Sequence, residues 1–188
     1  MLATRAVDAP ATAPATATAP ATQASAFPES YYWGTPIQRA KQHALEGKPA
    51  PEIKAIDWIG GAQTLADLRG KIVVLDIGAS WSSLWLNDAP RRNEFAEKYR
   101  DQGVRVVGIC SSPTGQDQMA TVVKERKLAF PVGKDSTQET ARSYMAMWWP
   151  TFAIVDRHGI LRALGVKPFQ VEDVVKTLLE EQPETKPH

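Results

Sequence analysis

Cysteine is almost missing from this sequence, because its 188 residues include only Cys110. A single cysteine excludes an intrachain disulfide, a Cys-x-x-Cys redox pair and a cysteine-rich zinc site. Histidine is also scarce, and the three histidines, His43, His158 and His188, do not have the spacing of metal ligands. We therefore predict that the protein holds neither a metal nor a cofactor.

An excess of charge of either sign is absent as well. The 22 basic and 21 acidic side chains leave a formal net charge of +1, which provides no basic field for nucleic acid. No apolar run approaches about 18 residues, so we expect no transmembrane segment. The opening residues 1–10 lack the apolar core of a signal peptide. The length suits one or at most two domains.

The first part of the chain has a restricted composition. Eleven alanines, five threonines and three prolines fill 19 of the positions 1–26. Proline removes helix hydrogen bonds, and small side chains cannot offset the entropy of ordering the backbone. We expect residues 1–30 to form a disordered tether and residues 183–188 a flexible tail. The tether is either a spacer that holds a domain away from a surface or an anchor, or a dispensable extension.

A short helix is expected next, in a linker over residues 31–46. Three small or apolar residues recur there at helical spacing, Ile37, Ala40 and Ala44. Pro36 precedes them at a position that suits the first turn of a helix. We predict that this helix docks on the domain that follows, which spans residues 47–182.

Within that domain, apolar runs alternate with amphipathic stretches. Strands are expected at 53–58, 71–77, 104–110, 151–156 and 160–166, and a short strand or extended piece is expected at 128–132. Helices are expected at 82–99 with a kink at Pro90, and at 117–127, 137–147 and 171–181. This order predicts an α/β sandwich, with a mixed central sheet flanked by helices and an N-terminal strand–turn extension.

Five short motifs follow one another along this domain. They are Gly47-Lys48-Pro49-Ala50-Pro51, Leu65-Ala66-Asp67-Leu68-Arg69-Gly70-Lys71, Gly78-Ala79-Ser80-Trp81-Ser82-Ser83-Leu84-Trp85 with Pro90, Trp149-Pro150-Thr151-Phe152, and Asp156-Arg157-His158-Gly159. Their order and spacing resemble the thioredoxin superfamily, in its TlpA/ResA and redoxin (AhpC/TSA-like) branch. The resemblance implies a thioredoxin-like fold, thiol-disulfide chemistry and an extracytoplasmic location, although the chain as given shows no export signal.

The third motif departs from that branch. Ser82 and Trp85 stand where the resemblance places the two redox cysteines. A serine hydroxyl ionises too weakly to replace a thiolate and cannot exchange electrons with a disulfide. Tryptophan is too large to replace a buried cysteine without repacking. We predict that dithiol–disulfide exchange is lost here and that no residue is a confident catalytic candidate.

Two residues keep an enzymatic alternative open. Cys110 ends a predicted strand, where ligand crevices form in doubly wound sheets, and it is the candidate nucleophile of a one-cysteine thiol oxidoreductase or peroxidase. The other interpretation is a small buried hydrophobic side chain. Asp76 matches the buried acid that serves the second cysteine in many thioredoxins. Without that cysteine, Asp76 is either a structural carboxylate or a general base for an unknown ligand.

Aromatic residues support a binding hypothesis instead. In the related fold, the segments around Trp85 and Trp149 face each other across the substrate groove. Tryptophan is enriched in binding hot spots, and the resemblance implies a cis peptide bond at Pro150 beside which extended peptides pair. We predict a non-catalytic module that binds a protein or peptide partner through Trp81, Ser82, Ser83, Leu84, Trp85, Trp149 and Pro150. Two alternatives stay open: Trp81 and Trp85 pack inward, and Ser82 and Ser83 only cap the helix.

Overall fold

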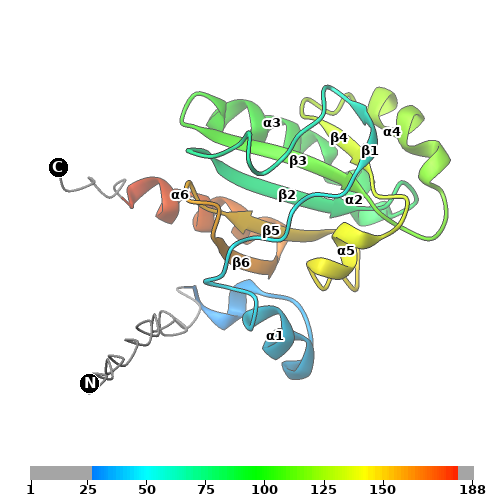
Figure 1. Cartoon of the computed structure of the whole chain (residues 1–188). Helices are drawn as coiled ribbons and strands as arrows, with labels where there is room; N and C mark the ends of the chain where they lie inside the picture. The colour runs from blue at the N-terminus through cyan, green and yellow to red at the C-terminus, as the bar shows by residue number, and fades with distance from the viewer. Residues whose placement is uncertain (1–26, 182–188) are drawn as a thin grey trace, which may run out of the picture.

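The structure is a computed structural model that describes residues 27–181. The predicted tether up to residue 26 and the predicted tail at 183–188 lie outside the described residues. Six strands form one mixed sheet in the order β1-β4-β3-β2-β5-β6, with helices on both sides of it (Figure 1). The predicted α/β thioredoxin-like sandwich is confirmed.

The central strand is β2, which is buried along its whole length. It pairs in parallel with β3 on one side and antiparallel with β5 on the other. The strands are β1 (Ile56–Ile59), β2 (Ile72–Gly78), β3 (Val104–Cys110), β4 (Val132–Lys134), β5 (Thr151–Val155) and β6 (Leu161–Val166). Of the short strand or extended piece expected at 128–132, only Val132 belongs to a strand, because Pro131 has no N–H to donate to a sheet ladder.

The α-helices are α1 (Pro36–His43), α2 (Ser83–Asn87), α3 (Ala89–Arg100), α4 (Met119–Glu125), α5 (Glu139–Ser143) and α6 (Val171–Glu180). Short 3₁₀ turns cover Glu29–Tyr31, Gln116–Gln118 and Pro168–Gln170. The single helix expected at 82–99 is divided into α2 and α3 at Asp88. Pro90 lies in the first turn of α3 and not at an internal kink, because a first-turn residue needs no intrahelical N–H donor.

Successive side chains of β2 point to opposite faces of the sheet, so they belong to two separate hydrophobic clusters. Val74 belongs to the cluster that also contains residues of α3, α4 and α6. Leu75 belongs to the cluster on the opposite face, with Leu68 and with Tyr144, which follows α5. Asp76 therefore lies on the same face as Val74, below α3.

The predicted tether ends earlier than residue 30. Phe27 is buried in the cluster that contains Val74, and Glu29 accepts a hydrogen bond from Arg39 of α1. Tyr32 forms a bridge to Val166 of β6. The described chain before residue 31 is therefore packed on the domain.

Helix α1 lies beside β6 at one edge of the sheet (Figure 1), but not through the predicted apolar face. Ile37 is 72% exposed, and the buried side chains of α1 are Arg39 and Gln42. Arg39 donates to the Leu164 carbonyl at 2.9 Å, and Glu46 accepts from the Leu164 amide at 2.9 Å. An edge strand presents unpaired backbone groups, so polar side chains and not alanines make this contact.

Candidate functional site

The turn that follows β2 brings two distant segments together at Ser82. The Ser82 side chain accepts a hydrogen bond from the Trp85 amide at 3.4 Å, so it is the N-cap of α2. The same hydroxyl donates to the Trp149 carbonyl at 3.1 Å, and the Trp149–Pro150 peptide bond is cis. Ser82 and Pro150 are buried, whereas Ser83 is exposed in the first turn of α2. Ser82 thus fixes the start of α2 to the loop before β5.

Trp85 forms the floor beneath this turn. Its side chain is fully buried, and its indole nitrogen donates to both carboxylate oxygens of Asp76, each at 3.0 Å. Gly78 leaves the room that the ring needs, since a Cβ at that position would lie 2.2 Å from the Trp85 indole nitrogen. The prediction that Trp85 contacts a partner is therefore wrong for its side chain. The inward-packing alternative holds for this residue.

Asp76 has a second partner that the sequence did not suggest. The Arg92 guanidinium forms an ion pair with Asp76, donates to the Trp85 carbonyl and lies over the Trp85 ring at 4.7 Å from its centroid. Both charged side chains are buried. Burial raises the pKa of Asp76, and the Arg92 guanidinium and the Trp85 indole oppose that rise. The geometry supports the structural interpretation of Asp76, because every contact named here is internal.

Arg92 could have been found from helical spacing. The buried residues of α3 are Ala89, Arg92, Ala96 and Tyr99, which recur at intervals of three and four. This is the spacing of a helix face that points to the core. An arginine within such a face needs a buried anion as its partner, and Asp76 is the carboxylate inside the predicted central strand.

The outer side of the turn exposes apolar surface. Trp81 is 53% exposed and Leu84 is 62% exposed. Trp81 meets Trp149 edge to face, with ring centroids 5.5 Å apart and an interplanar angle of 64°. We name Trp81, Leu84 and Trp149 the tryptophan patch. The structure thus brings together two of the predicted tryptophans, as the binding hypothesis requires, but leaves Trp85 out.

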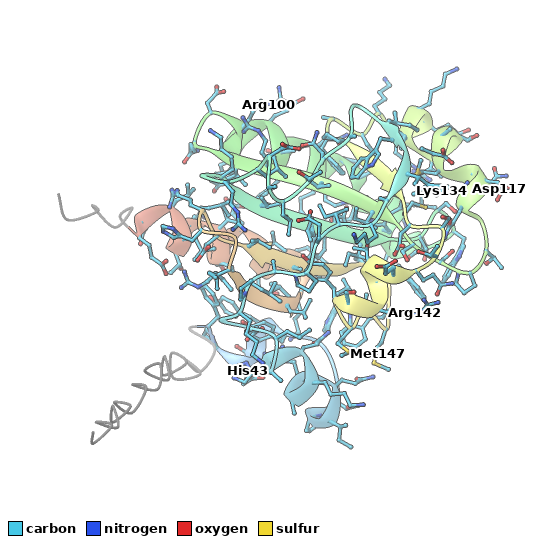
Figure 2. The ribbon with its side chains drawn as sticks, in the orientation of Figure 1. His43, Arg100, Asp117, Lys134, Arg142 and Met147 are labelled. Atoms are coloured by element: carbon cyan, nitrogen blue, oxygen red, sulfur yellow. The ribbon has the colours of Figure 1, made fainter. Side chains whose placement is uncertain are left out.

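Neighbouring loops hold the patch in place. The Trp81 indole nitrogen donates to the Ser112 hydroxyl at 3.2 Å. On the other side, the Trp148 ring approaches Gly34, where an added Cβ would lie 3.1 Å from it. Met147 lies between the α5 region and α1 (Figure 2), and its sulfur accepts a hydrogen bond from Gln38 at 3.7 Å. The loop that carries Trp149 is therefore supported by the N-terminal segment.

Cys110 does not meet the requirements of a nucleophile. Its side chain is fully buried in the cluster that contains Val74, and Cys110 pairs with Gly78 in the sheet register. Burial raises the pKa of the Cys110 thiol above its ordinary value. An exposed thiol with a lowered pKa, as the enzymatic alternative predicts, is not what the structure shows.

A family model described as the AhpC/TSA family matches residues 47–164 of the chain. This chain belongs to the AhpC/TSA family. It is 30% identical over 121 residues to "Thiol-disulfide oxidoreductase ResA" of Bacillus cereus, covering 64% of this chain and 69% of that protein. It is 27% identical over 122 residues to "Thioredoxin-like protein YneN" of Bacillus subtilis, covering 64% and 71%.

A solved structure agrees with this placement. A protein from Chlorobium tepidum, assigned as the thiol:disulfide interchange protein DsbE, superimposes with a TM-score of 0.64 at 27% identity. The match covers 71% of this chain and 97% of that one. The chain is thus a member of the ResA and redoxin branch of the thioredoxin superfamily. The ResA and DsbE relatives are named for thiol-disulfide chemistry. The present chain contains a single cysteine, Cys110.

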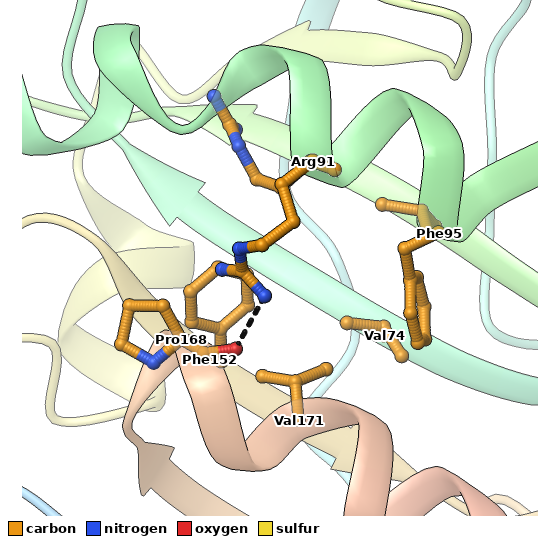
Figure 3. Close-up of a pocket in the computed structure, with 8 residues that line it drawn as sticks. Val74, Arg91, Phe95, Phe152, Pro168 and Val171 are labelled. Atoms are coloured by element: carbon orange, nitrogen blue, oxygen red, sulfur yellow. Dashed lines mark hydrogen bonds between the residues drawn. The ribbon is translucent and has the colours of Figure 1, made fainter.

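The described chain also has cavities whose lining residues lie outside the tryptophan patch. A small cavity lies between α3 and α6, where Arg91 donates to the Pro168 carbonyl at 2.8 Å (Figure 3). Its remaining lining residues are Val74, Arg92, Phe95, Val106, Phe152 and Val171, none of which belongs to the tryptophan patch. Within residues 27–181, no cluster of three His, Cys, Asp or Glu residues could hold a metal. None of the helices in this range could span a bilayer.

Proposed function

We propose that this family member is a non-catalytic, thioredoxin-like module without a redox dithiol, which binds a protein or peptide partner at the tryptophan patch. The observation that carries the proposal is the exposed Trp81 side chain, which meets the half-buried Trp149 edge to face, beside the cis peptide bond at Pro150. Large, rigid aromatic side chains provide contact area at low entropic cost and are frequent in binding hot spots.

The buried floor supports this proposal in a second way. Trp85, Asp76 and Arg92 bind one another beneath the turn, so the space below α2 is filled, and the Ser82 hydroxyl donates to a backbone carbonyl and not to a base. The chain also lacks the two thiols that thiol-disulfide exchange requires. What remains at the surface is an apolar, partly aromatic area with no nucleophile.

A test for the missing activity uses an insulin-reduction assay with dithiothreitol as the electron source. We expect the protein to leave the rate at the level of dithiothreitol alone. Acceleration that survives Cys110→Ala would contradict the loss of chemistry at this site. Acceleration that Cys110→Ala abolishes would instead support the enzymatic alternative, against the burial of that thiol.

Binding is tested with the full chain as bait for a display library of linear peptides without cysteine, so that no disulfide can capture them. We expect selected peptides to lose about 30-fold or more in affinity to Trp81→Ala, the effect of removing a hot-spot residue of at least about 2 kcal/mol. Phe169→Ala is the matched control, since Phe169 is an aromatic side chain that is 73% exposed elsewhere. Peptides that respond equally to both variants, or no peptide at all, would overturn the proposal.

A further inference from the structure

The sequence contains a segment whose chemistry fits the tryptophan patch. Residues 9–26 have no charged side chain and contain three prolines, Pro10, Pro14 and Pro20. Proline-containing segments favour the polyproline II conformation, in which the backbone carbonyls have no internal partners. Such segments dock on aromatic surfaces at low entropic cost, and an uncharged segment buries no ionised group when it covers apolar side chains.

The position at which this segment joins the domain is fixed. Phe27 is buried in the core, and Tyr32 is bridged to β6, so the described chain begins at one defined place on the domain. Twelve residues lie between Pro14 and Phe27, and the thirteen Cα–Cα steps that join the two can span at most about 45 Å. A domain of this size has a radius of gyration of about 15 Å. The length of the connecting chain therefore does not exclude contact between the Pro10–Pro14 region and the tryptophan patch.

We propose that residues 9–22 bind to the tryptophan patch of their own chain and compete there with the partner. This inference rests on the proposed function and names an occupant for its site. A tethered segment acts at an effective concentration in the millimolar range, so even weak contacts with Trp81, Leu84 and Trp149 keep the patch covered. A partner then has to displace the segment, and its apparent affinity is lower than its intrinsic affinity.

The test places a spin label on the full chain at Thr16→Cys. Cys110 is buried and is left in place, and mass spectrometry verifies a single label. We expect the label to broaden the indole N–H resonances of Trp81 and Trp149 but not that of Trp58, which lies on β1 at the other edge of the sheet from β6. Replacing Pro10, Pro14 and Pro20 with Ala in the labelled chain should remove the broadening.

Two results would overturn the proposal. One is broadening that is absent or equal at all three indoles. The other is broadening that falls on dilution with unlabelled protein, because it would show that a second copy supplies the segment.

A separate measurement distinguishes this proposal from the proposed function. A peptide selected on the patch should bind the triple Pro→Ala chain about tenfold more tightly than the natural chain, if the segment binds with a dissociation constant near 0.1 mM at millimolar effective concentration. Equal affinity for the two chains would refute self-occupation while leaving the patch as a binding site. Loss of all peptide binding in Trp81→Ala supports the site in either case.

Discussion

Two tryptophans four residues apart lie on opposite sides of one helical turn. Trp85 is fully buried and donates to Asp76, whereas Trp81 is 53% exposed and meets Trp149 edge to face. The residue type is the same, so the surroundings decide the outcome. Beneath Trp85 the strand supplies a carboxylate and the space left by Gly78, and beside Trp81 only loops approach. One tryptophan therefore stabilises the fold, and the other is available at the surface.

The largest expected effect is on the free energy of unfolding, and it distinguishes Trp85 from Trp81. Trp85→Ala should lower the free energy of unfolding by about 3–5 kcal/mol, because it leaves a cavity in a site that is closed on all sides. Trp81→Ala should lower it by less than about 1 kcal/mol, as is usual for exposed positions. Urea denaturation of both variants measures the difference. Similar losses in the two variants would mean that Trp81 also belongs to the stabilising core.

The next effect concerns the buried ion pair. Arg92→Met leaves Asp76 buried without its guanidinium, and we expect a loss of about 3–5 kcal/mol in the free energy of unfolding. Asp76→Asn combined with Arg92→Met should lose less than the two single variants together, because the uncompensated charge is gone. Strict additivity in this double-mutant cycle would show that the pair is not coupled.

The Arg92→Met variant should also change its dependence on pH. Burial already raises the pKa of Asp76, and removal of Arg92 removes the interaction that opposes this rise. The native state of the variant then binds a proton at a pH where the unfolded state does not, so its stability should increase as the pH falls toward the unfolded pKa of about 3.9. Denaturation at several pH values measures this slope, and a variant whose stability falls over that range would contradict it.

A smaller effect tests the space beneath Trp85. Gly78→Ala would place a Cβ 2.2 Å from the Trp85 indole nitrogen, and we expect a loss of about 1–3 kcal/mol from overpacking. In the Trp85→Ala background the same change should cost much less, because the ring is gone. A loss from Gly78→Ala that is equal in both backgrounds would show that Trp85 does not require glycine at this position.

The smallest effect belongs to an exposed ion pair, the surface counterpart of Asp76 and Arg92. Lys98 and Tyr99 donate to Glu172 and, with Lys176, lower the pKa of Glu172 to about 2. A lowered native pKa contributes stability above the unfolded value of about 4.3, and this is lost as the pH falls toward about 2. Glu172→Gln should flatten that part of the stability profile slightly, since solvent screens the pair. An unchanged profile would assign the acid sensitivity to other groups.

The elements that sequence patterns predicted well are those whose burial is uniform. Strand β3 has the expected bounds, Val104–Cys110, because a continuous apolar run is sufficient to identify a strand buried on both faces. Helix α6 ends within one residue of the expected position, because its apolar stripe is regular. Helix α1 was predicted with the wrong face, since its neighbour is a sheet edge, where Arg39 donates to the Leu164 carbonyl.

By itself, the sequence determined that this family member has one thiol, a thioredoxin-like order of strands and helices, and tryptophans at positions 81 and 85. Only the tertiary structure decided which tryptophan is buried. The Trp85 indole donates a hydrogen bond to Asp76, nine residues earlier on β2, and the Arg92 guanidinium from α3 lies over its ring. A buried indole needs a hydrogen-bond acceptor for its N–H group and side chains that pack on its ring. Other strands and helices supply both, and the local sequence around Trp85 does not specify them.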